Sequence, residues 1–173
     1  MKNKIIILLT LLLFISCSNL KNTEINTEKK YEILLNNWEL NELSLLLDSN
    51  INSEKNEITI KYRNLLQERL KSKKDLESMI EILKSQLKSN NLENIEMYFN
   101  DSFANRKIIS ELKKIDFSEI RVITSKPEFY KNTATNKVAV IFKDEVEYFQ
   151  FNYRLSNKKW SIMEIKDGRW YFA

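Results

Sequence analysis

The spacing of apolar residues divides this chain into a helical first part and a strand-forming second part. From Tyr31 onward, apolar residues recur at the three- and four-residue spacing of an amphipathic helix; Tyr31, Leu34 and Leu35 are the first of them. From Phe117 onward the alternation changes to a period of two, which is typical of strands with one buried face. The pattern therefore predicts an α+β fold in which N-terminal helices precede an antiparallel β-meander.

The apolar stripes predict four helical stretches. The first, over residues 31–50, is one kinked helix or two short ones, because the stripe changes phase near Asn36 and Asn37. A second begins at Ser53, a suitable N-cap, and ends where residues 72–75 interrupt the stripe. A third continues to about residue 90, and a short fourth carries Leu92, Ile95, Tyr98 and Phe99.

Five strands and their connecting turns follow from the alternating pattern. The predicted strands span residues 117–125, 128–131, 138–143, 146–155 and 160–166. The predicted turns lie at residues 132–136, 144–145, 156–158 and 167–168. The last turn contains Gly168, which is the only glycine and suits a tight hairpin. Residues 169–172 either pair back as a short strand or cover the core.

The N-terminus has the pattern of an export signal. Lys2 and Lys4 precede an apolar run over residues 5–15, which is too short to span a bilayer as a helix. The sequence Phe14-Ile15-Ser16-Cys17 resembles the lipobox of bacterial lipoproteins, although Phe14 replaces the usual leucine. The resemblance implies that Cys17 is lipidated and becomes the N-terminus after cleavage. The alternative is an ordinary secretion signal followed by an incidental cysteine.

These patterns predict four parts of the chain and a location. They are a signal peptide over residues 1–16, a lipidated Cys17 with a flexible tether over 17–30, a helical extension over 31–73, and an α+β domain over 74–173. We expect the protein to be anchored through its lipid in the cell envelope, at the outer membrane or the cell surface.

Composition excludes several classes of chemistry. The chain has no histidine, which rules out histidine-based triads, histidine general bases and histidine metal ligands. Its single glycine rules out a glycine-rich phosphate loop. Without Lys2 and Lys4, 26 basic and 24 acidic residues leave a net charge of +2, too balanced to predict a nucleic-acid partner. A single cysteine allows no disulfide within the chain. We predict no cofactor and no metal.

The second part of the chain resembles the NTF2-like cone fold. A helix, a short helix and an antiparallel meander end in Asn157-Lys158-Lys159-Trp160-Ser161-Ile162, which is similar to the polar turn, tryptophan and apolar strand near the end of such domains. The resemblance implies a curved sheet wrapped on a long helix, with a pocket inside the cone. It carries over no catalytic residue, because the polar groups that enzymes of this fold use are not matched here.

Three functions remain open at this stage. The favoured one is a non-catalytic binding module that contacts another protein or an apolar ligand; the others are a self-associating or adhesive helical protein and a small-molecule enzyme. We expect either a protein partner of unknown identity or a homo-oligomer. Aromatic residues of the second part form the candidate pocket or contact surface: Tyr98, Phe99, Phe103, Tyr130, Tyr148 and Trp160. The alternative is that these residues are ordinary core aromatics.

Overall fold

A computed structural model describes residues 26–49 and 57–168 of the chain. The predicted signal peptide, Cys17, the Ser53 cap and residues 169–172 lie outside these residues. The described part separates into two compact units that meet between Leu66 and Gln67. No helix within the described ranges combines the length and the apolar character that crossing a membrane requires.

The first unit consists of helices. A helical segment over residues 26–36 is followed by α2 (Leu40–Ser49) and by the first part of α3 (Glu57–Lys88). Of the two predicted alternatives, one kinked helix or two short ones, the structure has the second, because the chain turns at Asn37 and Trp38, and Trp38 has a positive φ of 60°. Among the described residues of this unit, the buried apolar side chains are Tyr31, Leu34, Leu35, Leu40, Leu43, Leu47, Tyr62 and Leu66.

The tether prediction is wrong for its last residues, because residues 26–30 are helical. The polar composition of this stretch, which lacks periodic apolar residues, predicts a coil. Lysine and glutamate are nevertheless good helix formers. Glu28 also accepts a 2.8 Å hydrogen bond from Lys61 Nζ on α3, which ties this first turn to its own unit.

The predicted interruption at residues 72–75 is also wrong, since α3 runs through it without a break. These residues include neither glycine nor proline, so nothing in the backbone stops the helix. Ser72 keeps its place in α3, and its carbonyl oxygen accepts a 2.8 Å hydrogen bond from Trp160 Nε1. The predicted end of the helix is confirmed. Asn90 has a φ of 53°, and the Asn91 amide bonds back to the Gln86 carbonyl, as in a Schellman cap.

Two short helices follow α3. The predicted fourth helix is reduced to a single 3₁₀ turn, η2 (Ile95–Tyr98). The helix α4 (Phe103–Leu112) was not predicted. It begins at Ser102, whose hydroxyl accepts a 3.2 Å hydrogen bond from the Asn105 amide in a regular N-cap.

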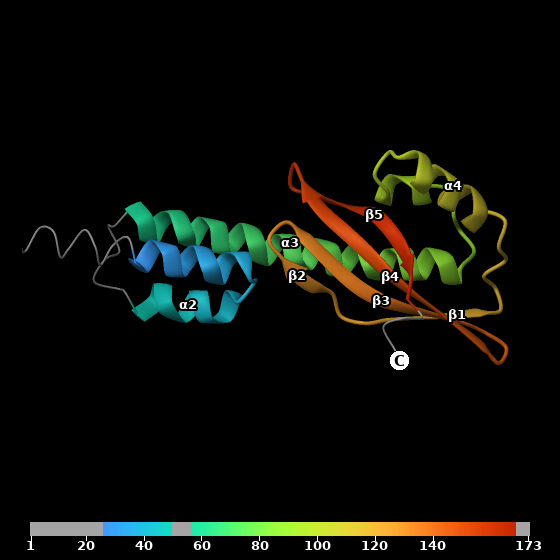
Figure 1. The fold of residues 1–173 in the computed structure, drawn as a ribbon, viewed down its shortest axis with the longest axis horizontal. Helices are drawn as coiled ribbons and strands as arrows, with labels where there is room; N and C mark the ends of the chain where they lie inside the picture. Colours follow the sequence, from blue (N-terminus) through green and yellow to red (C-terminus); the bar gives the residue numbers. More distant parts are fainter. Residues whose placement is uncertain (1–25, 50–56, 169–173) are drawn as a thin grey trace, which may run out of the picture. The chain divides into compact units, whose positions relative to one another are not determined.

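Five antiparallel strands form one curved sheet, which confirms the α+β class (Figure 1). The strands follow the order β1-β3-β4-β5, and β2 pairs with the other end of β3. Their bounds are β1 (Ile120–Thr124), β2 (Glu128–Tyr130), β3 (Thr133–Phe142), β4 (Glu145–Ser156) and β5 (Lys159–Asp167).

The turns between strands are tighter than predicted. Residues 133–136 belong to β3, not to a turn, and Glu145 belongs to β4. The chain reverses instead at residues 131–132, 143–144 and 157–158. Each of these two-residue turns contains at least one residue with a positive φ, namely Lys131, Lys143, Asn157 and Lys158. The turn at 157–158 lies within the predicted turn at 156–158, whereas Lys131 and Lys143 fall outside the predicted turns, because lysine is not a usual turn residue.

Gly168 serves close packing and does not have the positive φ of a primed hairpin turn. Its amide donates a 2.7 Å hydrogen bond to the Tyr148 carbonyl on β4. A Cβ at this position would lie 3.0 Å from the Phe149 nitrogen, tighter than ordinary contacts between atoms. The glycine therefore allows the end of β5 to lie directly against the β4 backbone.

One face of the sheet packs on the part of α3 that belongs to the second unit. Leu76 is fully buried on α3, and Tyr153 and Ile162 are buried on the sheet. The hairpin of β2 and β3 is held to the same helix, because Arg69 donates hydrogen bonds of 2.9 Å to the Lys131 carbonyl and to Asn132 Oδ1. We call this helix-facing side the inner face.

The open edge of β5 is covered by polar bonds from η2 and α4. Phe99 forms a parallel bridge with Ile162, and the Asn100 amide donates to the Ile162 carbonyl at 2.9 Å. The buried side chain of Asn105 adds bonds from Nδ2 to the carbonyls of Ile162 (3.1 Å) and Met163 (3.3 Å). Met163 is the extra residue of a bulge in β5, and Asn105 bonds the backbone there.

We expect Asn105→Ala to lower the free energy of unfolding by about 2 kcal/mol, because buried carbonyls would lose their donor. Urea denaturation measures this difference. Asn94→Ala is the matched control, since Asn94 is exposed and its side chain makes no cap bond. Equal midpoints for the two variants would contradict the role of Asn105.

Candidate functional site

The second unit contains a cavity of about 240 Å³ on the inner face of the sheet. Ten of its eleven lining side chains are apolar, and the eleventh is the exposed carboxylate of Asp167. The lining residues are Leu87, Ile108, Leu112, Phe117, Val122, Val138, Val140, Phe149, Phe151, Ile165 and Asp167.

The cavity lies where α3 ends. Leu87, in the last turn of α3, is the only residue of that helix among the lining residues. Ile108 and Leu112 line the cavity from α4, one turn apart on the same face. Phe117 lines the cavity from the connection before β1, and the sheet supplies the rest through the period-two alternation of its strands, as in Val138 and Val140. Only the last turn of α3 and the short helix α4 therefore cover this end of the sheet, and they leave space between themselves and the strands.

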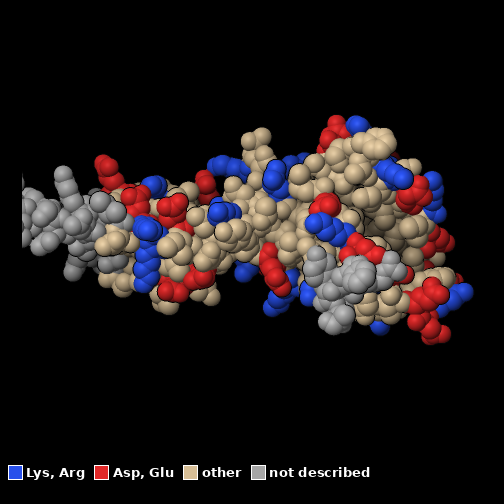
Figure 2. Space-filling model, viewed as in Figure 1, with Lys and Arg blue, Asp and Glu red and all other residues tan. Residues whose placement is uncertain are grey.

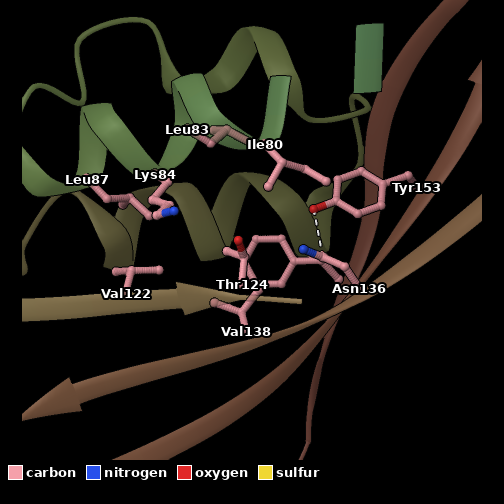
Figure 3. A pocket seen from close by; sticks show the side chains of 10 residues that line it. Ile80, Leu83, Lys84, Leu87, Val122, Thr124, Asn136, Val138 and Tyr153 are labelled. Carbon is pink, nitrogen blue, oxygen red and sulfur yellow. Dashed lines mark hydrogen bonds between the residues drawn. The ribbon is translucent and has the colours of Figure 1, made fainter. Parts of the chain in front are cut away.

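A smaller hollow of about 20 Å³ lies beside the cavity and shares four of its lining residues, Leu87, Val122, Val138 and Phe151. Figure 3 shows this hollow between α3 and the strands. Its polar lining consists of Lys84 from α3, Thr124 from β1, Asn136 from β3 and Tyr153 from β4.

A buried hydrogen bond closes one side of the hollow. The Tyr153 hydroxyl donates to Asn136 Oδ1 at 2.9 Å, and both side chains are almost fully buried (Figure 3). Burial raises the pKa of the Tyr153 hydroxyl, because the phenolate would lose its hydration. Asn136 Nδ2 is buried without a hydrogen-bond partner. Figure 3 shows this nitrogen directed into the hollow.

Among the described residues, the carboxyl groups whose pKa is shifted lie at the surface. Hydrogen bonds to backbone amides and contacts with lysines lower the pKa of Glu96, Glu111 and Asp116, so these groups stay ionised at neutral pH. None of the three lines the cavity. Within residues 26–49 and 57–168, no cluster of acidic or cysteine side chains is suited to hold a metal ion.

The structure does not bring the six predicted aromatic residues together in one pocket. Tyr98 and Trp160 line the same groove, whereas Phe99 is buried against β5. Phe103 and Tyr130 are largely exposed, with 79% and 56% of their surface accessible. Tyr148 lies half-buried on β4, on the face away from Phe149 and the cavity. None of the six lines the cavity on the inner face.

The groove at Tyr98 and Trp160 is separate from the cavity and from the hollow beside it, and it has a volume of about 300 Å³. It also contains the charged side chains of Asp75, Lys158 and Lys159. The groove is therefore more polar than the cavity on the inner face and suits an apolar ligand less well.

Sequence reasoning missed the residues that form the cavity. The missing signal was α4: Ser102 is a good N-cap, and Ile108, Ile109 and Leu112 follow at helical spacing. With α4 placed, the alternating residues of β3 and β4 would have indicated an apolar surface shared between α4 and the end of α3. The aromatic character of the six predicted pocket residues says little about which face of the sheet or helix each of them occupies.

No protein family, no curated protein and no solved structure matches the chain.

We expect Tyr153→Phe to lower the free energy of unfolding at neutral pH by roughly 1–2 kcal/mol, because the buried Asn136 Oδ1 would lose the hydrogen bond from the Tyr153 hydroxyl. Wild-type stability should also fall as the pH rises above 10.0, the ordinary pKa of tyrosine. Above that value the unfolded chain releases a proton that the buried Tyr153 retains. Urea titrations at neutral and alkaline pH measure both effects.

Tyr130→Phe serves as the control for this comparison, since Tyr130 is exposed. It should match the wild type at neutral pH and keep the same alkaline loss, whereas Tyr153→Phe should show a smaller one. An alkaline loss that is identical in all three proteins would show that Tyr153 is not the responsible group.

Proposed function

We propose that this protein is a non-catalytic binding module of a bacterial cell envelope, anchored by lipid at Cys17, and that its second unit holds a small apolar molecule. The observation that carries the proposal is the cavity of about 240 Å³ with its almost entirely apolar lining. The N-terminal lipobox pattern supports the anchor.

The size and lining of the cavity suit a small ligand. An apolar cavity of about 150 Å³ in another protein stays dry and binds benzene, so this larger one has room for a bigger group. Ligand pockets usually have volumes from about 300 Å³ upward, which places this cavity at the small end of that range. Burial of each methylene of a ligand contributes about 0.8 kcal/mol, which provides the driving force.

The chemistry of the lining supports binding more than catalysis. General acid–base catalysis needs a group with a suitable pKa within hydrogen-bond reach of the substrate. The cavity offers one carboxylate, Asp167, and it is exposed to solvent. The buried hydroxyl of Tyr153 has a raised pKa and donates to Asn136, which makes it a poor base at neutral pH.

Surface charge gives no support to a nucleic-acid partner. On the face drawn in Figure 2, basic and acidic side chains are interspersed, without a continuous basic area. Nucleic-acid interfaces are much more positive than this.

We also propose that the second unit has the NTF2-like cone architecture. A curved antiparallel sheet, a long helix on its inner face and a cavity inside the curve all support this assignment. The proposed architecture is independent of the ligand, because folds of this kind serve many functions.

We expect the neutral fluorophore N-phenyl-1-naphthylamine to bind the protein saturably, with increased emission. Val140→Phe should weaken binding at least tenfold, because the larger ring occupies the cavity that Val140 lines. Fluorescence titration of the full chain in lipid nanodiscs measures this, with empty nanodiscs as the blank.

Ile123→Phe is the matched control for this titration. It introduces the same ring on a neighbouring strand, at an exposed position that does not line the cavity. Non-saturable binding, or equal loss in both variants, would refute a ligand site in this cavity.

We expect Cys17→Ala to release the protein from membranes or to block its processing, because the thiol carries the acyl chains. Membrane fractionation and the mass of the mature protein report the two outcomes. Ser18→Ala, next to the lipobox, should behave like the wild type. If Cys17→Ala leaves both the fractionation and the mass unchanged, the anchor is excluded.

A further inference from the structure

The hollow beside the cavity contains an unsatisfied hydrogen-bond donor. Asn136 retains 3% of its surface exposure, and its Oδ1 is occupied by the Tyr153 hydroxyl. Its Nδ2 has no partner, although a buried amide without one costs about 1–3 kcal/mol. A donor in this position calls for an acceptor oxygen, supplied by a water molecule or by a ligand.

A positive charge lies on the same hollow. Lys84 extends from α3 toward the strands (Figure 3) and lines the hollow together with Asn136. Its ammonium group contacts Glu81 at 3.3 Å, in a pair whose side chains are both substantially exposed. Exposed pairs of this kind contribute about 0–1 kcal/mol, so exchanging Glu81 for another anion costs little.

The hollow and the apolar cavity are neighbours on the inner face and share four lining residues, so a path from one to the other follows β3. Asn136, Val138 and Val140 alternate on β3, with Asn136 at the hollow and Val140 at the cavity. Four residues of strand from Asn136 to Val140 correspond to roughly 13 Å at about 3.3 Å per residue. A ligand that follows this path has a small polar head at one end and an unbranched apolar body.

We propose that the site takes an aliphatic carboxylate with a chain of about ten carbons, with one carboxylate oxygen on Asn136 Nδ2 and the other near Lys84. This proposal rests on the proposed function and adds the class of ligand to it. The hollow of about 20 Å³ has room for one carboxylate oxygen, because a cavity needs about 10–15 Å³ to admit one water, so the second oxygen lies at the border with the adjoining cavity. The tail occupies the apolar cavity.

Three probes with the same chain and different heads test this assignment: decanoate, decan-1-ol and decylammonium, each below its critical micelle concentration. Equilibrium dialysis of the full chain in lipid nanodiscs, with empty nanodiscs subtracted, gives the affinities. We expect decanoate to bind at least tenfold more tightly than decylammonium and several-fold more tightly than decan-1-ol.

Two variants test the head contacts. Lys84→Gln should weaken decanoate three- to tenfold and leave decan-1-ol unchanged, whereas Lys88→Gln, exposed on the same helix and outside the lining, should change neither. Asn136→Asp keeps an acceptor for Tyr153 and replaces the donor by an anionic oxygen, so it should weaken decanoate at least tenfold.

The outcomes separate this inference from the proposed function. Equal affinity for decanoate and decan-1-ol, or decanoate affinity that neither variant changes, overturns the carboxylate assignment while binding of the alcohol upholds the apolar site. A crystal structure with decanoate in the cavity and a water on Asn136 also overturns it. Failure of all three probes to bind refutes both.

Discussion

The second unit depends on one packing constraint: a single helix must cover the inner face of a sheet that extends beyond the helix. Leu76 and Leu83 on α3 are buried, and buried Ile162 and Tyr153 belong to the sheet that packs on this helix. The helix stops at Lys88, where Asn90 takes the left-handed conformation and the chain turns away. Beyond that point only the short helix α4 covers the strands, and two surfaces of different curvature leave a cavity.

Buried asparagines carry the polar bonds that this arrangement needs. Because β5 lies at the edge of the sheet, its carbonyls would be unpaired without η2 and α4, and Asn105 supplies donors to two of them. Asn136 performs a comparable task inside the sheet by accepting from Tyr153. A single cysteine permits no intrachain disulfide, so packing and these bonds hold the unit together.

The order of helices and strands could be predicted from the sequence because periodicity reports which residues are buried. The long alternation from Val146 to Leu155 gave β4 within a residue or two, and the phase shift at Asn36–Asn37 gave the division of the first helices. The prediction failed where polar residues play unusual roles. Lys131 and Lys143 form turns through positive φ, and Ser72 to Asp75 continue a helix that seemed to stop.

The candidate site could not be predicted in the same way, because periodicity indicates which residues are buried but not whether the space between them is filled. Its walls consist of ordinary core residues, such as Val138 and Phe151, whose pattern is identical to that of a filled core. The residues that differ from a normal core are Asn136 and Lys84, and asparagine and lysine are too frequent in this chain to attract notice.

An apolar cavity beside a hollow that is lined by a buried donor and a lysine supports the proposal of ligand selection without reaction. A chemical step would require a group that changes its protonation or attacks a bond, and the lining offers a donor that cannot ionise, a lysine beside solvent and an exposed acid. Amide and ammonium groups can bind a carboxylate, and the apolar walls limit the length of the tail that fits. Selection by head charge and chain length is therefore the task that we propose for this geometry.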